Sequence, residues 1–241
     1  MTTIAATNNS ALTPDRVSVR SLLWELAKKD VYFSAGPLLA YFALGILGVG
    51  LLATGHEAAF YTGALLLMSA VIVTGAHLVF VNVVGERGQQ NLPLVMSLPI
   101  TYMQYSVSKL GANLGIFLLA WLILVGAAVG TILGKEGLPN GLTPFTVIML
   151  LELFLAYVLV LCVALVMESE AWTIVVMTIT NILISLVMYS LNKIEGIGPY
   201  VSGPVAVWNR SSLGLIAAEL LAIVLLIAAT LLIQSRKHDY L

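Results

Sequence analysis

The sequence predicts an all-α membrane protein that crosses the bilayer six times and keeps both ends in the cytoplasm. Three observations predict it: the composition, six long apolar runs, and the distribution of Lys and Arg. Of the 241 residues, 60% are apolar and only 10% are charged, and the mean hydropathy is +1.01. A soluble domain carries roughly 25% charged residues. Immersion in lipid explains this composition better than an unusually large aqueous core.

The predicted spans are apolar runs close to the length of about 20 residues that crosses a hydrocarbon core about 30 Å thick. They lie near residues 36–53, 60–84, 110–133, 145–167, 171–191 and 213–233. The first run is the shortest and contains Gly45, Gly48 and Gly50, so its ends are the least well defined. If it failed to cross, the orientation of every later span would invert.

The basic residues set the predicted orientation, because Lys and Arg accumulate in short cytoplasmic loops. Eight of the 11 basic residues fall on one side of the six-span topology, and three fall on the other. The first set is Arg16, Arg20, Lys28, Lys29, Arg87, Lys109, Arg236 and Lys237, and the second is Lys135, Lys193 and Arg210. The first side is therefore predicted to be cytoplasmic and the protein to lie in the plasma (inner) membrane.

Two elements are expected before the first span. Residues 1–15 are polar and nearly uncharged, which predicts a disordered tail and gives no sign of a cleavable signal peptide. Residues 16–30 have an apolar face opposite a charged face, which predicts an amphipathic elbow helix. This helix either lies in the headgroup layer, with Trp24 at its flank, or stands free of the membrane. Residues 16–241 then form a single transmembrane domain.

The connection over residues 192–212 is the longest one predicted on the outer side. It is rich in Gly and Pro and carries Tyr200 and Trp208. Such a segment is either a re-entrant structure or a loop anchored by aromatic side chains at the interface. The sequence favours the loop.

No motif of an enzyme is present. The segment 130–136 comes nearest to a nucleotide-binding loop, but it lacks the required spacing and the hydroxyl residue after its Lys. Only His77 of the three histidines lies clearly within a span, and the sequence has no zinc signature or clustered metal ligands. Cys162 lies inside an apolar run, where a packing role is expected. The chain is therefore predicted to lack catalytic activity, a metal and a cofactor of its own.

Several polar side chains are predicted to lie at membrane depth, where ionisable groups are default candidates for function. They are Glu152, Glu219, His77, Asn82, Asn113 and Asn181. The two carboxyls either line a polar cavity, pair with a basic group or stay protonated, or they sit close enough to an interface to reach water. Interhelical hydrogen bonding is the commoner role of the other four. Glycines at four-residue spacing in the third span, from Gly111 to Gly134, also favour close helix packing there.

The segment 85–109 is the most informative part of the sequence. Glu86 and Arg87 follow the second span, an apolar stretch comes next, and Lys109 lies where the third span begins. This order predicts a short helix on the cytoplasmic surface, whose apolar side chains are available to the groove of a partner. They are Leu94, Val95 and Leu98, followed by Pro99. The alternative is a helix that lies passively on the headgroups.

This order of residues resembles the membrane subunits of ABC exporters of the second exporter class, the ABC-2 type. The likeness lies in Glu86-Arg87, Ser97-Leu98-Pro99 and Lys109, and it extends to the predicted elbow helix and the six spans. It implies a permease subunit that pairs with a second, identical or sister permease. It also implies that residues 86–108 contain a coupling helix for separate ABC ATPase subunits, which hold ATP and Mg²⁺. The connection 192–212 departs from the family because it shows no clear pair of re-entrant half-helices.

The resemblance implies ATP-driven export of an amphipathic or apolar cargo, such as a peptide, an antibiotic or a lipid-like molecule. Spans with few fixed charges suit such a cargo better than a polar solute. The alternative is a protein that acts without an ATPase. It would be a secondary carrier or an immunity-type membrane binding protein that uses Glu152 or Glu219.

Overall fold

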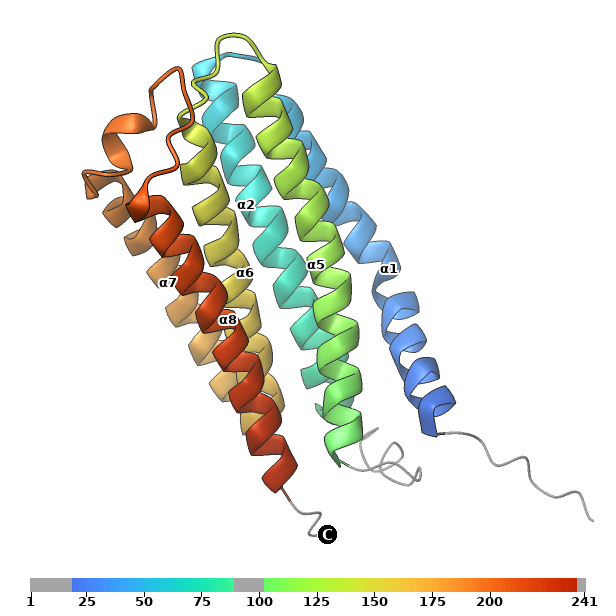
Figure 1. Cartoon of the computed structure of the whole chain (residues 1–241). Helices are drawn as coiled ribbons and strands as arrows, with labels where there is room; N and C mark the ends of the chain where they lie inside the picture. Colours follow the sequence, from blue (N-terminus) through green and yellow to red (C-terminus); the bar gives the residue numbers. More distant parts are fainter. Residues whose placement is uncertain (1–18, 89–101, 238–241) are drawn as a thin grey trace, which may run out of the picture.

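A computed structural model describes residues 19–88 and 102–237, and its described part is helical with no strand. Six long helices form the bundle of Figure 1. They are α1 (Val19–Leu52), α2 (Glu57–Val79), α5 (Tyr102–Gly134), α6 (Leu142–Met167), α7 (Glu170–Lys193) and α8 (Arg210–Arg236). Each contains a stretch long and apolar enough to cross a membrane, so the prediction of six spans is confirmed.

Three short elements complete the described chain. The π-helix η1 (Phe80–Val84) continues α2 and leads into α3 (Gly85–Gly88), while the 3₁₀-helix η2 (Gly198–Tyr200) lies between α7 and α8. Helix α1 begins, and helix α8 ends, at the same end of the bundle (Figure 1). We call this the basic end, because Lys28, Lys29, Lys109 and Lys237 lie there.

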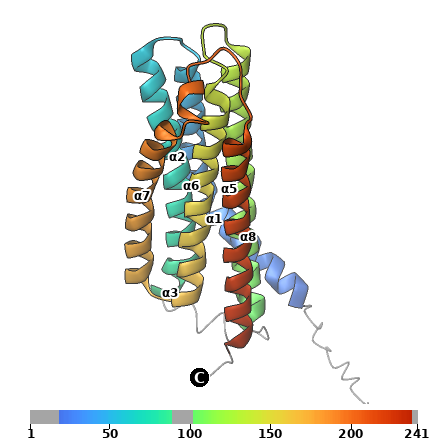
Figure 2. The same ribbon diagram turned by 60° about the vertical axis from the view of Figure 1, so that its left-hand side comes forward.

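Helix α6 is the centre of the bundle and packs against α2, α5, α7 and α8 (Figure 2). In its most apolar window 67% of the residues are buried, against 17–39% in the corresponding windows of the other five helices. A helix that is apolar on all sides lies either in lipid or in a protein core, and α6 is the helix of this bundle that other helices enclose most. Tyr157 of α6 stacks on Phe117 of α5 with ring centroids 3.8 Å apart. The indole N–H of Trp121 donates to the Leu150 carbonyl at 2.7 Å. Ring stacking and this hydrogen bond therefore fix α5 against α6.

The close glycine contact lies between α1 and α2 rather than at the glycines of the third span. A Cβ added to Gly48 would lie 2.7 Å from the Gly63 carbonyl oxygen, and one added to Gly63 would lie 2.5 Å from that of Gly48. Around the glycines of α5 the described chain places nothing within 4 Å of such a Cβ. These glycines are Gly111, Gly115, Gly126, Gly130 and Gly134. The spacing in the third span therefore does not correspond to close packing within the described chain.

The predicted elbow is not a separate helix in the described chain, because residues 19–30 form the first turns of α1. Figure 2 shows these turns diverging from the bundle. Nothing between Asp30 and Phe33 stops a helix, and Pro37 lies inside α1. A Pro within a helix removes one hydrogen bond and bends the helix without necessarily ending it. The amphipathic stretch and the first span therefore share one bent helix.

The connection between α7 and α8 is a loop with a single short helix, as the sequence favoured. The N–H of Gly141 donates to the Gly203 carbonyl at 2.9 Å, which ties this loop to the one before α6. Helix α8 then begins at a capping box, in which Asn209 and Ser212 each accept a hydrogen bond from the other's backbone N–H. No re-entrant helix is present in this connection.

The glycine contact between α1 and α2 gives a first prediction. Gly48→Ala should destabilise the protein by about 1–3 kcal/mol, because the added methyl group has no room in the contact. Gly50→Ala is the matched control on the same helix, since no atom lies within 4 Å of its added Cβ. It should be neutral or slightly stabilising, because Ala favours a helix over Gly by about 0.5–1 kcal/mol. Thermal unfolding in detergent, followed by Trp fluorescence, measures both, and equal effects would contradict the contact.

Candidate functional site

The candidate site is built around the ammonium group of Lys109, which lies on α5 at the basic end. Its side chain is only 1% exposed. The Nζ atom lies 2.8 Å from both carboxylate oxygens of Asp30 and 2.8 Å from Oε2 of Glu86. Asp30 comes from α1 and Glu86 from α3, so one cation joins three separate segments of the chain.

Two further side chains complete this ionic cluster, which we define as Lys29, Asp30, Glu86, Tyr105 and Lys109. Lys29 forms an ion pair with the other carboxylate oxygen of Glu86. The hydroxyl of Tyr105, which is fully buried, donates to Glu86 Oε2 at 3.1 Å. The cluster contains two carboxylates and two ammonium groups, so its formal charges cancel. Every carboxylate oxygen in it has a charged partner.

The ionisation of Glu86 reflects two opposing effects. Burial raises the pKa of the Glu86 carboxyl, but the nearby ammonium groups of Lys109 and Lys29 outweigh burial and leave the pKa below its ordinary value. Glu86 is therefore a carboxylate at neutral pH. It can balance the buried charge of Lys109 without itself taking up a proton.

A row of hydrogen-bonded side chains continues from the cluster toward the membrane interior. The Ser34 hydroxyl donates to Asn82 Oδ1 at 3.0 Å, and Asn82 Nδ2 donates to Asn113 Oδ1 at 2.9 Å. Asn113 Nδ2 then donates to the backbone carbonyl of Lys109 at 2.8 Å. We call Ser34, Asn82 and Asn113 the amide chain. All three are buried. The amide chain joins α1, η1 and α5, and η1 leads directly into the α3 turn that carries Glu86.

Asn82 lies in the middle of the π-helix η1, between the regular turns of α2 and Glu86. A π-helical turn is an irregularity that recurs at functional sites. The hydrophobic pattern of residues 60–84 predicts a continuous span and gives no sign of this turn. The π-turn lies where the span passes into the polar site.

The structure brings together some of the predicted coupling residues. Glu86 and Lys109, separated by 22 intervening positions, form an ion pair. Arg87 lies in α3, and its side chain is not described. The other predicted residues lie outside the described chain, so the coupling helix itself is not described. They are Leu94, Val95, Ser97, Leu98 and Pro99.

Sequence reasoning missed four members of the site: Lys29, Asp30, Ser34 and Tyr105. The available signal was the position of Asp30 directly before an apolar run, where an unpaired carboxylate is unfavourable. Its partner Lys109 lies 79 residues away in the chain. No local pattern reveals a pairing over that distance.

The remaining polar candidates lie away from the cluster. Asn181 donates to the carbonyl of Met177 in its own helix at 2.7 Å, so this amide group does not join two helices. His77 packs edge-on against Tyr41 with ring centroids 5.5 Å apart. The described residues include no group of three or more side chains able to hold a metal ion.

Glu152 and Glu219 lie at a similar level in two packed helices. Two hydrogen bonds show which residues of α6 and α8 lie side by side: Cys162 contacts Leu226, and Gln234 contacts Leu165. The same offset between the two helices places Glu152 beside Glu219. Glu152 is ten residues into α6, which places it about 15 Å along the helix axis. Glu219 is only 8% exposed, and its Oε2 has no hydrogen-bond partner among the described residues. The two carboxyls thus form a second polar location, separate from the ionic cluster.

The buried charges of the cluster give a second prediction. Lys109→Met should destabilise the protein by about 3–5 kcal/mol, because it leaves two buried carboxylates without their shared cation. Lys28→Met is the matched control, since Lys28 pairs with Glu25 at the surface, and an exposed pair contributes about 0–1 kcal/mol. Thermal unfolding in detergent compares the two. Combining Lys109→Met with Asp30→Asn should recover part of the loss, and no recovery would argue against charge as the cause.

A third prediction concerns pH. The pKa of Glu86 is lower in the folded protein than in the unfolded chain, so its stabilising effect is complete above the ordinary Glu value of about 4.3. This effect is lost as the pH falls through the lower, folded-state value. Unfolding temperatures measured from neutral to acidic pH should therefore fall less steeply in Glu86→Gln than in the unmodified protein. Identical slopes would contradict the ion pairing of Glu86.

Comparison with protein-family models, curated proteins and solved structures found no match to this chain. The role of the ionic cluster must therefore be inferred from its own residues and from the six-helix bundle around it.

Proposed function

We propose that the chain is the permease subunit of an ATP-driven ABC exporter, powered by separate ATPase subunits. The single observation that carries the proposal is the ion pair between Glu86 and Lys109. These residues stand at the two ends of the connection whose order of residues resembles the coupling segment of ABC-2 permeases. Both are fixed to α1 through Lys29 and Asp30.

The cluster supports a mechanical role for this connection. A partner that pulls on residues 87–108 acts on two anchor points, Glu86 and Lys109, that are joined to each other and to α1. Because the joining charges are buried, they separate only at a high cost in free energy, since each would be left as a buried charge without a partner. A displacement of the connection is therefore transmitted to α1, α2 and α5 as a rigid-body motion.

The orientation belongs to the same proposal. The basic end faces the cytoplasm, because Lys and Arg accumulate on that side of plasma-membrane proteins. The connection between Glu86 and Lys109 then lies where an ATPase can bind it. A second permease copy, identical or sister, completes the pathway, and the cargo is an amphipathic or apolar molecule.

A carrier that works without an ATPase is the second candidate function. The observation that favours it is the buried, unpaired Oε2 of Glu219 at the level of Glu152. Two carboxyls deep in a bundle can bind and release a proton during transport. This candidate needs no partner at the basic end, which separates it from the ABC permease.

The fourth prediction tests the ATPase. The tagged chain, purified from its native membrane, should carry along an ATPase subunit that mass spectrometry identifies. Leu98→Glu and Pro99→Gly should lose that subunit and uncouple transport from ATP hydrolysis, while membrane insertion stays normal. Val205→Glu introduces a carboxylate into an exposed loop at the opposite end and is the control that should keep the ATPase.

Two results would overturn the proposal. One is purification without any ATPase under conditions that keep the bundle folded. The other concerns orientation: a cysteine introduced at Ser97 should react with a membrane-impermeant maleimide only when the cytoplasmic face is open. Reaction from outside would exclude a cytoplasmic connection, and with it the ABC permease.

A further inference from the structure

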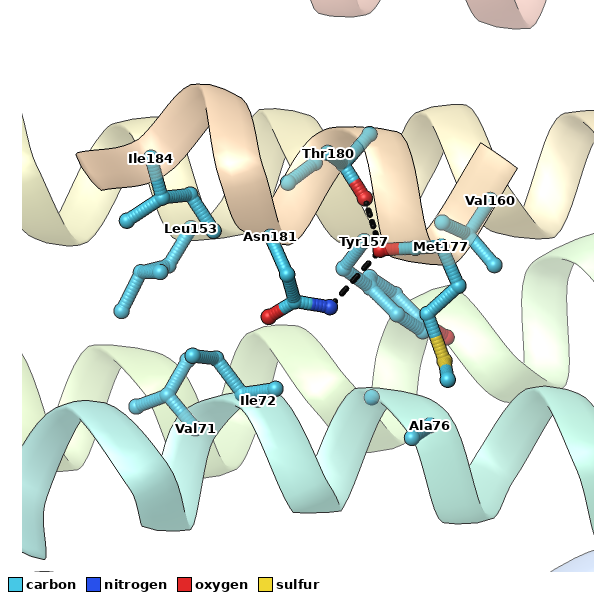
Figure 3. Close-up of a pocket in the computed structure, with 12 residues that line it drawn as sticks. Val71, Ile72, Ala76, Leu153, Tyr157, Val160, Met177, Thr180, Asn181 and Ile184 are labelled. Atoms are coloured by element: carbon cyan, nitrogen blue, oxygen red, sulfur yellow. Dashed lines mark hydrogen bonds between the residues drawn. The ribbon is translucent and has the colours of Figure 1, made fainter. Parts of the chain in front are cut away.

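A groove runs along α6 between α2 and α7. Both helices pack against α6, but they are not among the helix pairs in extended contact with each other. Figure 3 shows the inner part of this space, with Asn181 and Met177 projecting from α7 toward α2 and Tyr157 behind them. We call the space the α6 groove.

The groove contains two cavities that follow one another along the same helix faces. The larger, of about 600 Å³, lies at the end opposite the basic end, and the smaller, of about 30 Å³, lies deeper in the bundle. Side chains at three- and four-residue spacing on α6 line first one cavity and then the other, as expected for one face of a helix. They are Leu142, Phe145, Met149, Leu153, Ala156 and Val160.

The dimensions of the larger cavity suit part of an amphipathic molecule. From Leu142 to Met149 its lining covers seven helical steps on α6, or about 10 Å at 1.5 Å per residue. This is about one third of a hydrocarbon core about 30 Å thick. The larger cavity alone is within the range of about 300–1,000 Å³ that is typical of ligand sites.

The polarity of the groove changes along its length. Its mouth is lined by His56, Glu57, Asn192 and Ser202, whose side chains offer a carboxylate and other hydrogen-bonding groups. Below the mouth the lining is apolar and includes Met68, Met149 and Met188, flexible side chains that adapt to varied apolar shapes. A molecule with a polar head and an apolar chain matches this order.

Tyr157 lines the inner cavity and carries a hydroxyl group that is buried within the bundle. The hydroxyl of Tyr157 is buried and has no hydrogen-bond partner among the described residues. A buried hydroxyl without a partner is unfavourable. At about 30 Å³ the inner cavity has room for little more than a water molecule, so the chain of a ligand would end above it.

We propose that the α6 groove binds a bilayer lipid with an amine-bearing headgroup, taken from the leaflet on the side opposite the basic end. The amine lies at the mouth beside Glu57, where charge complementarity favours it, and one acyl chain extends along α6. This site goes beyond the export function and does not depend on it. Lipid binding is measured on the chain alone, so it can fail or succeed independently of the ATPase.

The test uses the purified chain in nanodiscs that contain phosphatidylcholine and a small fraction of photoactivatable phosphatidylethanolamine. The probe carries a diazirine halfway along one acyl chain, and mass spectrometry locates the labelled residues. Labelling should concentrate on groove residues such as Met68 and Met149 rather than on Leu65 and Leu119, which face outward from the bundle. Unlabelled phosphatidylethanolamine should compete more strongly than phosphatidylcholine.

Ala64→Trp fills the larger cavity from α2, and Leu65→Trp places the same side chain on the exposed face one residue on. Ala64→Trp should reduce groove labelling to the level seen on the outer face, because the indole occupies the space that the acyl chain would fill. Leu65→Trp should leave it unchanged. Glu57→Gln should keep the labelling but abolish the preference for phosphatidylethanolamine.

Three outcomes would overturn the proposal. Labelling spread evenly over the groove and the outer face would indicate only non-specific boundary lipid. Unchanged labelling in a folded Ala64→Trp variant would place the lipid elsewhere. If that variant does not fold, Met188→Trp fills the cavity from α7 instead and must give the same loss. Exclusion of the probe together with cross-links between copies at Met188 would assign the groove to a second copy of the chain.

Discussion

The arrangement of the basic end depends on one buried cation. The ammonium of Lys109 lies among oxygens from α1 and α3, and both carboxylates that supply them are buried. In such surroundings a charge that loses its partner is strongly unfavourable, whereas the intact group adds little net stability. The cluster therefore acts mainly as a constraint on position. The cluster fixes α1, α5 and the end of the α2 segment relative to one another. Any other arrangement of these segments would break several ion pairs at once.

The other half of the bundle is held in a different way. Helices α7 and α8 share an apolar core with α6 that includes Leu161, Ile184 and Ile223. Near the basic end the α8 segment is also linked to α6, where Lys237 donates to the Val166 carbonyl and Gln234 to that of Leu165. Between α2 and α7 the structure has no comparable link. Buried ion pairs thus fix α1, α5 and the end of the α2 segment, whereas apolar packing on α6 holds α7 and α8. The α6 groove lies between these two sets of helices.

The number and approximate limits of the spans could be predicted from the sequence, because hydrocarbon thickness alone sets the length of an apolar helix. The likeness to ABC-2 permeases also pointed to Glu86 and Lys109, although not to their direct contact. The roles of Asp30 and Tyr105 were not predictable, since both depend on side chains that are remote in the chain. The sequence predicts a separate helix over residues 16–30, because the amphipathic pattern stops at Asp30 and the apolar first span follows. Such a change resembles the boundary between two helices. Backbone hydrogen bonding continues through that change, and Pro37 only bends the helix. The glycine spacing in α5 favoured close packing, but the described chain places no neighbour against these glycines. Spacing identifies a smooth helix face but not the neighbour that covers it.

The long separation of Asp30 from Lys109 has a consequence for biosynthesis. A ribosome that adds 5–20 residues per second needs about 4 to 16 seconds to add the 79 residues from Val31 to Lys109. During that interval Asp30 stands at the start of the first span without its main partner, so it favours a position near water. The final position of α1 against α5 can then form only after the third span has been made.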